Sequence, residues 1–211
     1  MDKLKFSTVL LTISFLVTAQ HVYAQGDVAR GEVEFAVCAV CHGVNGEGNA
    51  TLNSPRISGM EPYYTVRQLQ YFRDGLRAPD ASDIYGTQMR AISMTLEGDQ
   101  VLQDLAAYIE TLDSLSSAAT IVGADINAGK ASYALCQACH APDGTGNEAL
   151  NTPSLVGQHD WYVERQIMNY RDSIRGASPQ DIFGAQMRPM VGTLASDEAV
   201  TNVAAYIKTL Q

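Results

Sequence analysis

Two short segments of the sequence combine two cysteines with a histidine in the pattern C-x-x-C-H. The first contains Cys38, Cys41 and His42, and the second contains Cys136, Cys139 and His140. On a helical turn this spacing lets the two sulfurs reach the two vinyl positions of one porphyrin, and it directs the next imidazole at the iron. Each segment therefore predicts one covalently bound haem c group, and the chain predicts two.

The same cysteines are open to other interpretations. Four cysteines in an exported protein could form two disulfides, and a C-x-x-C pair could be a thioredoxin-like redox site. A thioredoxin-like site needs a βαβ context, which this sequence lacks. Two structural zinc sites would need four ligands each, whereas each segment offers two cysteines and one histidine. Haem attachment is favoured because the motif occurs twice at equivalent positions.

The chain matches itself at a constant offset of 98 residues, without a gap. Both C-x-x-C-H segments coincide under this shift, and the match extends over about 80 residues, as expected for duplication of a whole domain. We therefore predict two tandem domains, at 25–112 and 125–211. The segment 113–124 is small and polar, and we interpret it as the linker between them.

The hydrophobic pattern of each unit is helical, and it shows no strand-like alternation of useful length. A first helix follows a capping aspartate, Asp27 or Asp125, and runs into the cysteine segment. Middle helices are predicted at 62–73 and 160–171. The last helices carry apolar stripes at helical spacing, namely Leu102, Leu105, Ala106, Ile109 and Leu112, then Val200, Val203, Ala204, Ile207 and Leu210. We expect an all-α fold in which three short helices and long loops surround one large apolar group in each unit.

Each iron needs a sixth ligand, and no second histidine is shared by the two units. His159 coincides with Glu61 under the 98-residue shift, so a pair of bis-histidine haems is disfavoured. Methionine is the usual partner of histidine in cytochromes that carry electrons, and its soft, neutral sulfur raises the reduction potential. Met89 and Met187 are the only methionines that coincide under the shift. Buried methionine is often only core filler, but we predict that these two, in loops, are the ligands.

Pro55 and Pro153 each lie 13 residues after the histidine of their unit. Either proline could simply make its loop rigid. Alternatively, a carbonyl in this loop could accept a hydrogen bond from the other ring nitrogen of the ligating imidazole and so fix its tautomer and orientation. The two roles are compatible, and both stay open at this point.

The first 24 residues are typical of a cleaved export signal. Lys3 and Lys5 precede an apolar run at 6–19, and a small-x-Ala site ends at Ala24, so we expect a mature chain that begins at Gln25. The alternative is an uncleaved membrane anchor, although the run is short for a bilayer core of about 30 Å. We expect the mature protein to be soluble in an exported compartment.

Acidic residues outnumber basic ones in both units. Residues 27–112 contain 12 acidic and 6 basic side chains, and residues 125–211 contain 9 and 6. This balance argues against nucleic acid and anionic membranes as partners and favours a protein with a basic docking patch. Because the first unit is the more acidic, we expect the partner to dock there.

These residues resemble the cytochrome c family, and the tandem arrangement resembles its dihaem cytochrome c4 group. The resemblance rests on both C-x-x-C-H segments, the Pro-x-Leu/Ile-x-Gly loops and a methionine seven residues before Leu96 or Leu194. It implies that the first and last helices cross at a glycine beside aromatic rings: Gly31 with Phe35 and Tyr108, then Gly129 with Tyr133 and Tyr206. It also implies two haems that face each other across a pseudo-twofold interface. One departure is Met60, where the second unit has Gln158.

The resemblance implies an electron carrier rather than an enzyme. The expected role is transfer between respiratory redox proteins in a bacterial periplasm, towards a terminal oxidase, near a membrane-bound complex. Two alternatives remain open. A dihaem peroxidase-like enzyme would need an open iron site with acid or base groups nearby, and a dihaem subunit of a dehydrogenase or oxidase complex would differ in its partner rather than in its chemistry.

Overall fold

The computed structural model describes residues 26–79, 81–113 and 117–210. The predicted signal peptide at 1–24, with its cleavage site after Ala24, lies outside the described residues. Within the described part no helix is long and apolar enough to cross a membrane.

The described residues form helices joined by loops, and the only strand-like pairing among them is two isolated β-bridges. The first unit contains α1 (Val28–His42), the 3₁₀ helix η1 (Ala50–Leu52), α2 (Pro62–Arg73), α3 (Ile84–Ser93) and α4 (Gly98–Thr111). The second contains α5 (Ile126–His140), η2 (Glu148–Leu150), α6 (Asp160–Arg171), α7 (Ile182–Val191) and α8 (Asp197–Lys208). The all-α class is confirmed, and all but the last pair of elements repeat at an offset of 98 residues.

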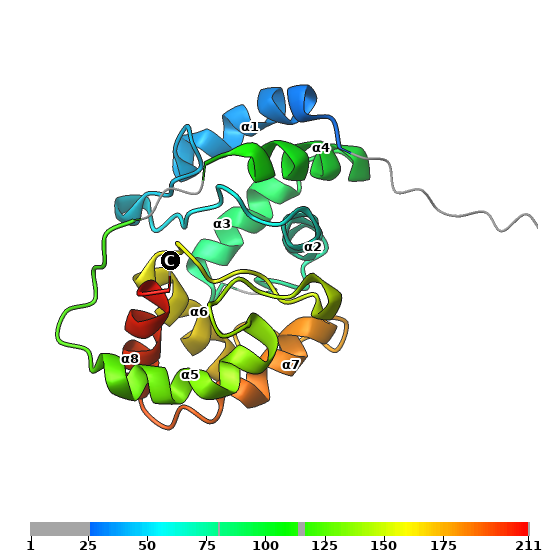
Figure 1. Cartoon of the computed structure of the whole chain (residues 1–211). Helices are drawn as coiled ribbons and strands as arrows, with labels where there is room; N and C mark the ends of the chain where they lie inside the picture. Colours follow the sequence, from blue (N-terminus) through cyan, green and yellow to red (C-terminus); the bar gives the residue numbers. More distant parts are fainter. Residues whose placement is uncertain (1–25, 80, 114–116, 211) are drawn as a thin grey trace, which may run out of the picture.

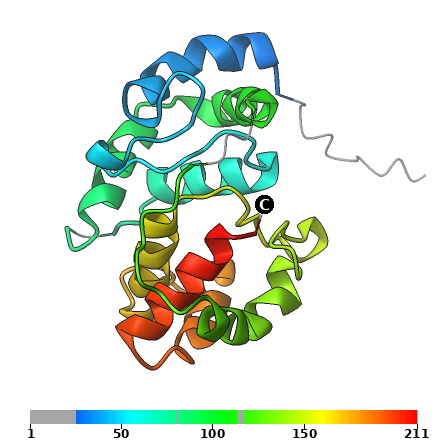
Figure 2. The same cartoon turned by 60° about the vertical axis from the view of Figure 1, so that its left-hand side comes forward.

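The two units lie one above the other in Figure 1, with α1 and α4 at the top and α5 and α8 at the bottom. Figure 2, turned by 60°, shows the same separation, with the described linker residues running along one side. Two residues of the second unit hold this part of the linker. Asp160 accepts from the backbone amides of Thr120 and Ile121, and Lys208 donates to Ser117 Oγ at 2.8 Å.

The helix starts follow the capping pattern of the sequence. Asp27 accepts hydrogen bonds from the amides of Ala29 and Arg30, and Asp125 caps α5 in the same way. The middle helices have the predicted bounds.

The prediction of three helices per unit was wrong, because α3 and α7 are additional helices. Each is only 10 residues long and is capped by an aspartate, Asp83 or Asp181, that accepts from the amide three residues later. A glycine in each helix, and Pro189 inside α7, weaken the local helical signal.

The first and last helices of each unit cross at a glycine. A Cβ on Gly31 would lie 2.0 Å from the backbone oxygen of Asp104, so only glycine permits the approach. Beside this crossing the rings of Phe35 and Tyr108 are 5.2 Å apart, and Gly129, Tyr133 and Tyr206 repeat the arrangement with rings at 5.4 Å. The implied crossing is therefore confirmed in both units.

The units face each other through α2 and α6, and their hydrogen bonds are reciprocal. Arg67 donates to the backbone oxygen of Asn151 at 2.9 Å, and Arg165 donates to that of Asn53 at 3.0 Å. Because Arg67 and Arg165 are equivalent in the repeat, as are the two asparagines, the bonds are related by a pseudo-twofold rotation. The interface has the symmetry that the resemblance implied.

Substitution of Gly31 should test the helix crossing. Gly31→Ala should lower the free energy of unfolding by about 1–3 kcal/mol, a typical cost of overpacking, although alanine favours an isolated helix. Chemical denaturation measures the loss, with Ala36→Val on the exposed face of α1 as the control. A Gly31→Ala protein as stable as the control would contradict the close crossing.

Candidate haem sites

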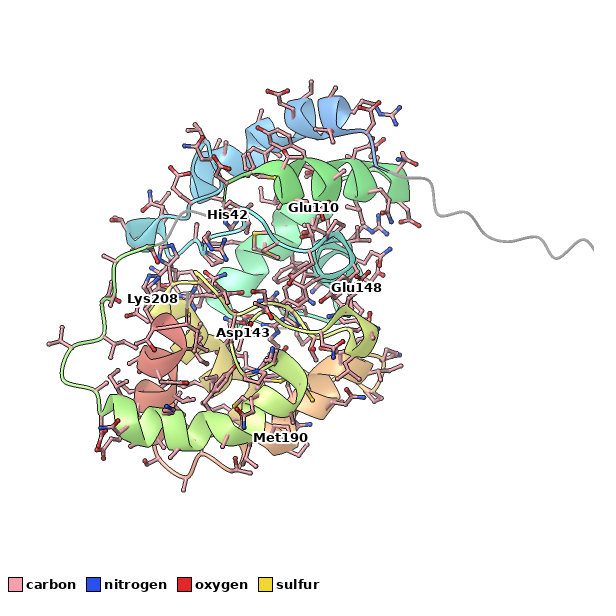
Figure 3. The ribbon with its side chains drawn as sticks, viewed as in Figure 1. His42, Glu110, Asp143, Glu148, Met190 and Lys208 are labelled. Atoms are coloured by element: carbon pink, nitrogen blue, oxygen red, sulfur yellow. The ribbon has the colours of Figure 1, made fainter. Side chains whose placement is uncertain are left out.

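Each predicted haem histidine is the last residue of its helix. The chain leaves α1 at Gly43 with φ of 84° and leaves α5 at Ala141 with φ of 66°. Both values lie in the left-handed region, which ends the helix directly after the imidazole. His42 and His140 are each only 6% exposed, so the helix end delivers the ring into the interior of its unit. Figure 3 shows His42 below the end of α1, on the side towards the second unit.

The two prolines mark the acceptors for the imidazole rings. His42 Nδ1 lies 2.8 Å from the carbonyl oxygen of Pro55, and His140 Nδ1 lies 2.9 Å from that of Pro153. A carbonyl oxygen only accepts, so Nδ1 carries the hydrogen and Nε2 keeps its lone pair for an iron.

The loop approaches this carbonyl closely at a glycine. A Cβ on Gly48 would lie 2.7 Å from the carbonyl carbon of Pro55, and one on Gly146 would lie 2.6 Å from that of Pro153. Both glycines also have positive φ, 86° and 81°. Their amides donate to the backbone oxygens of His42 and His140 at 2.7 and 2.9 Å. The histidine, the glycine and the proline carbonyl thus form one fixed local unit in each copy.

The electrostatics of the rings favour neutral imidazole. Burial lowers the pKa of both His42 and His140, and the hydrogen bond to the proline carbonyl only partly opposes it. Neutral imidazole is the form that binds a metal.

Covalent attachment of haem requires cysteine thiols that are not already joined in disulfides. All four are free of disulfides. Burial raises the pKa of Cys38 to about 11 and also raises that of Cys136. A thioredoxin-like thiol would instead have a lowered pKa. No group of three or more metal-binding side chains of the kind a zinc site needs occurs among the described residues.

The structure places Met89 on α3 and Met187 on α7, so the prediction that they lie in loops was wrong. Both side chains are half-buried, and Met187 packs against the core of its unit, as Cys136 does. The neighbours Met94 and Met190 are 61% and 38% exposed. Figure 3 shows Met190 at the end of the second unit that lies away from the first.

Sequence reasoning missed a buried polar ring between the units. Arg77 donates to Gln68, Tyr162 and Gln166, and Arg175 donates to Gln166, Tyr64 and Gln68, at 2.7 to 3.1 Å. The signal was present, because Arg77 and Arg175 coincide under the 98-residue shift.

At Met60 the sequence departs from the family pattern, and this difference also affects the interface between the units. Gln158, its counterpart, donates to the backbone oxygen of Arg56 at 2.9 Å, whereas Met60 packs against the core of the first unit. The difference therefore changes contacts between the units as well as inside one pocket.

Comparison with known proteins identifies the family. The family model for cytochrome c matches residues 28–113 and 126–211. The chain belongs to the cytochrome c family. A cytochrome c4 from Azotobacter vinelandii is 32% identical over 217 residues, which cover 96% of this chain and 97% of that protein. A thiosulfate dehydrogenase electron acceptor from Stutzerimonas stutzeri (strain A1501) is 33% identical over 195 residues, covering 89% and 83%.

A solved structure supports the same group. The reduced recombinant cytochrome c4 from Pseudomonas stutzeri matches this fold with a TM-score of 0.72 at 30% identity, over 88% of this chain and 100% of that chain. The chain is therefore a dihaem c-type cytochrome of the cytochrome c4 group, with two covalently bound haem c groups. The free thiols and the neutral, oriented imidazoles fit these groups.

The proline loops give a testable prediction. Because the acceptor is a backbone carbonyl, Pro55→Ala should leave the axial ligands of its haem unchanged. The variant should still lose about 0.4–1 kcal/mol of unfolding free energy, since alanine gives the unfolded chain more freedom. Denaturation and the visible spectrum measure the two effects, with Pro153→Ala as the matched change. Loss of low-spin coordination in Pro55→Ala would contradict the carbonyl's role.

Proposed function

We propose that this cytochrome is a freely diffusing electron shuttle in which both irons are six-coordinate. Cys38 and Cys41 hold the first haem, and Cys136 and Cys139 hold the second. His42 and Met89 ligate the first iron, and His140 and Met187 ligate the second. The observation that carries this assignment is the repeated imidazole unit, combined with half-buried methionines at one register in both copies.

The roles of the protein residues follow from their positions. A bound haem supplies reversible one-electron chemistry at its iron. Pro55 and Pro153 hold the imidazole orientation through the Nδ1 hydrogen bond, and a fixed ligand keeps structural change on electron transfer small. Apolar residues from the first and last helices exclude water from the interior of each unit. Met89 and Met187 would each supply a second protein ligand to the iron of their unit and so keep small molecules from binding there.

We further propose that the protein works in a bacterial periplasm, after cleavage behind Ala24, and passes electrons from a respiratory donor towards a terminal oxidase. The domain boundaries 25–112 and 125–211, with the linker 113–124, belong to this proposal. A second candidate is a subunit or acceptor of a dehydrogenase. It is favoured by the relative that serves as a thiosulfate dehydrogenase electron acceptor.

The carrier and an enzyme differ in the access of small molecules to iron. A closed, methionine-ligated iron should bind carbon monoxide negligibly at neutral pH, and the reduced protein should react only slowly with hydrogen peroxide. Stopped-flow absorbance measures both reactions. Strong carbon monoxide binding together with rapid turnover of peroxide would support the peroxidase-like alternative instead.

Replacement of methionines should identify the ligands. Met89→Ala should lower the potential of one haem and remove its share of the near-infrared charge-transfer band from methionine to ferric iron, and Met187→Ala should do the same to the other haem. Met94→Ala and Met190→Ala are matched controls on more exposed sulfurs. The assignment in a unit is wrong if its control variant loses the band while the Met89 or Met187 variant keeps it.

The partner surface that we propose lies on α1. Val33, Val37 and Val40 follow one another at helical spacing, opposite the buried Gly31 and Phe35, and Val44 lies two residues after the last residue of the helix. These four side chains are between 41% and 76% exposed. The equivalent residues of the second unit are Ala131, Leu135, Ala138 and Pro142.

This apolar stripe adjoins a haem attachment residue and lies in an acidic surface. The exposed Cys41 follows Val40, and Glu32 and Glu34 are exposed on the same helix. An electron-transfer protein with a small apolar contact area and a basic rim complements this surface. The excess of acidic residues in the first unit strengthens the preference for docking there.

Paired substitutions should test the docking surface. V33S/V40S should slow second-order electron transfer with a basic redox protein several-fold, whereas A131S/A138S on α5 should leave it unchanged. All rates should fall as added salt shortens the screening length to about 8 Å at 0.15 M. A wild-type dimer in sedimentation that V33S/V40S abolishes would assign the stripe to a second copy of the chain and overturn the proposal.

A further inference from the structure

An arginine of the first unit crosses the interface and joins two segments of the second. Arg67 on α2 donates from its terminal nitrogens to Asn151, to Oδ1 at 3.4 Å and to the backbone oxygen at 2.9 Å. The same guanidinium lies over the ring of Phe183 on α7, 4.3 Å from the ring centre. A planar guanidinium can form such a hydrogen-bond fork and stack on an aromatic ring at once, whereas an ammonium group cannot.

The two segments joined in this way carry the axial side chains of the second haem site. Asn151 lies two residues before Pro153, whose carbonyl accepts from His140. Phe183 lies four residues before Met187 on α7, and residues four apart share one face of a helix. The arginine of the first unit therefore connects the histidine side of the second site with its methionine side.

Arg165 on α6 makes the reciprocal contacts with the first unit. It donates to Oδ1 and to the backbone oxygen of Asn53 at 2.9 and 3.0 Å, and its guanidinium lies 4.4 Å from the ring centre of Tyr85 on α3. Asn53 is again two residues before the proline, Pro55, and Tyr85 is again four residues before the methionine, Met89. The fork and the stacked ring thus recur together at equivalent positions.

The helices that carry the methionines have little support from their own units. Both α3 and α7 have only 10 residues, and helices this short are unstable in water without packing. Each buries only two residues, Gly86 and Ser93 in α3 and Gly184 and Val191 in α7. Among the described residues, the hydrophobic core of the first unit includes none from α3. A contact from outside the unit is therefore important for holding these helices in place.

We propose that Arg67 and Arg165 are positioning residues for the methionine ligand of the opposite unit. Each arginine holds the helix that carries the methionine against the loop that carries the imidazole acceptor, and so opposes movement of the methionine away from its site. Each haem site is then complete only when the other unit is present, which gives the duplication a function beyond doubling the number of haems. The inference rests on the proposed methionine ligands.

Displacement of methionine by added imidazole measures how readily each methionine leaves its iron. Variants that lack one methionine separate the sites, because M89A should keep the near-infrared band of the second haem alone and M187A that of the first. In the ferric M89A holoprotein, Arg67→Gln should lower the imidazole concentration that removes half of the band about three- to tenfold. Arg165→Gln should leave it unchanged there. In M187A the two effects should be exchanged.

Two further variants show whether the stacked contact is responsible. Phe183→Leu removes the ring but keeps an apolar side chain, and in M89A it should act like Arg67→Gln, so the inference stays testable if one variant folds poorly. R67Q/F183L should show less than the product of the two separate effects, because both remove one contact. Arg73→Gln is the control and should change neither site, since Arg73 lies on α2 but pairs with Asp99 of its own unit.

Three results would overturn the inference. They are an arginine variant that loosens only the methionine of its own unit, an equal change in M89A and M187A, and no change in either. An equal change would mean that the arginines only hold the units together. A failure of the ligand assignment looks different, because the band would then persist in the M89A/M187A protein. If that protein has lost the band, the three results reject only the role of the arginines.

Discussion

The hydrogen bond from histidine Nδ1 to a proline carbonyl is the constraint on which the rest of each unit depends. It fixes the tautomer of a ring that is almost fully buried, and so it determines which nitrogen is available to iron. The helix must end directly after the histidine, the following loop must return to the carbonyl, and a glycine must let the two backbones approach. The first and last helices then cross closely enough to enclose the ring. The same set of conditions is satisfied twice, which explains why so many residues recur at one offset.

The sequence predicted the parts of the fold that depend on local pattern. The capping aspartates, the middle helices and the apolar stripes of α4 and α8 were correct because each rests on spacing within a few residues. It missed α3 and α7, whose glycines and Pro189 hide a helix that tertiary packing stabilises. Sequence analysis left two roles open for the proline loops, and the structure shows one of them, a carbonyl that accepts from the imidazole. The methionine ligands stay a prediction. The bonds around Arg77 and Arg175 that cross between the units join residues 85 to 111 positions apart, and periodicity within one unit carries no information on such contacts.

The molecule combines a symmetric scaffold with asymmetric detail. Reciprocal arginine and asparagine bonds hold the two units in a pseudo-twofold arrangement, which keeps the two haem sites in one rigid relation. On this scaffold the units differ in detail. Val33 and Val40 of α1 correspond to Ala131 and Ala138, and the buried Ser58, Thr65 and Ser93 correspond to valines. Duplication supplies two sites with the same C-x-x-C-H segment and the same oriented imidazole, and a few substitutions then give them different neighbours.

The central claim is that each repeated unit binds its own haem through its own cysteine pair. Denaturing mass measurement under reducing conditions tests it most directly, after expression with a working haem-attachment system. The wild-type chain, beginning at Gln25, should carry two haem masses, and C136S/C139S should carry one. A wild-type chain with no attached haem, or a cysteine variant that still carries two, would contradict the account.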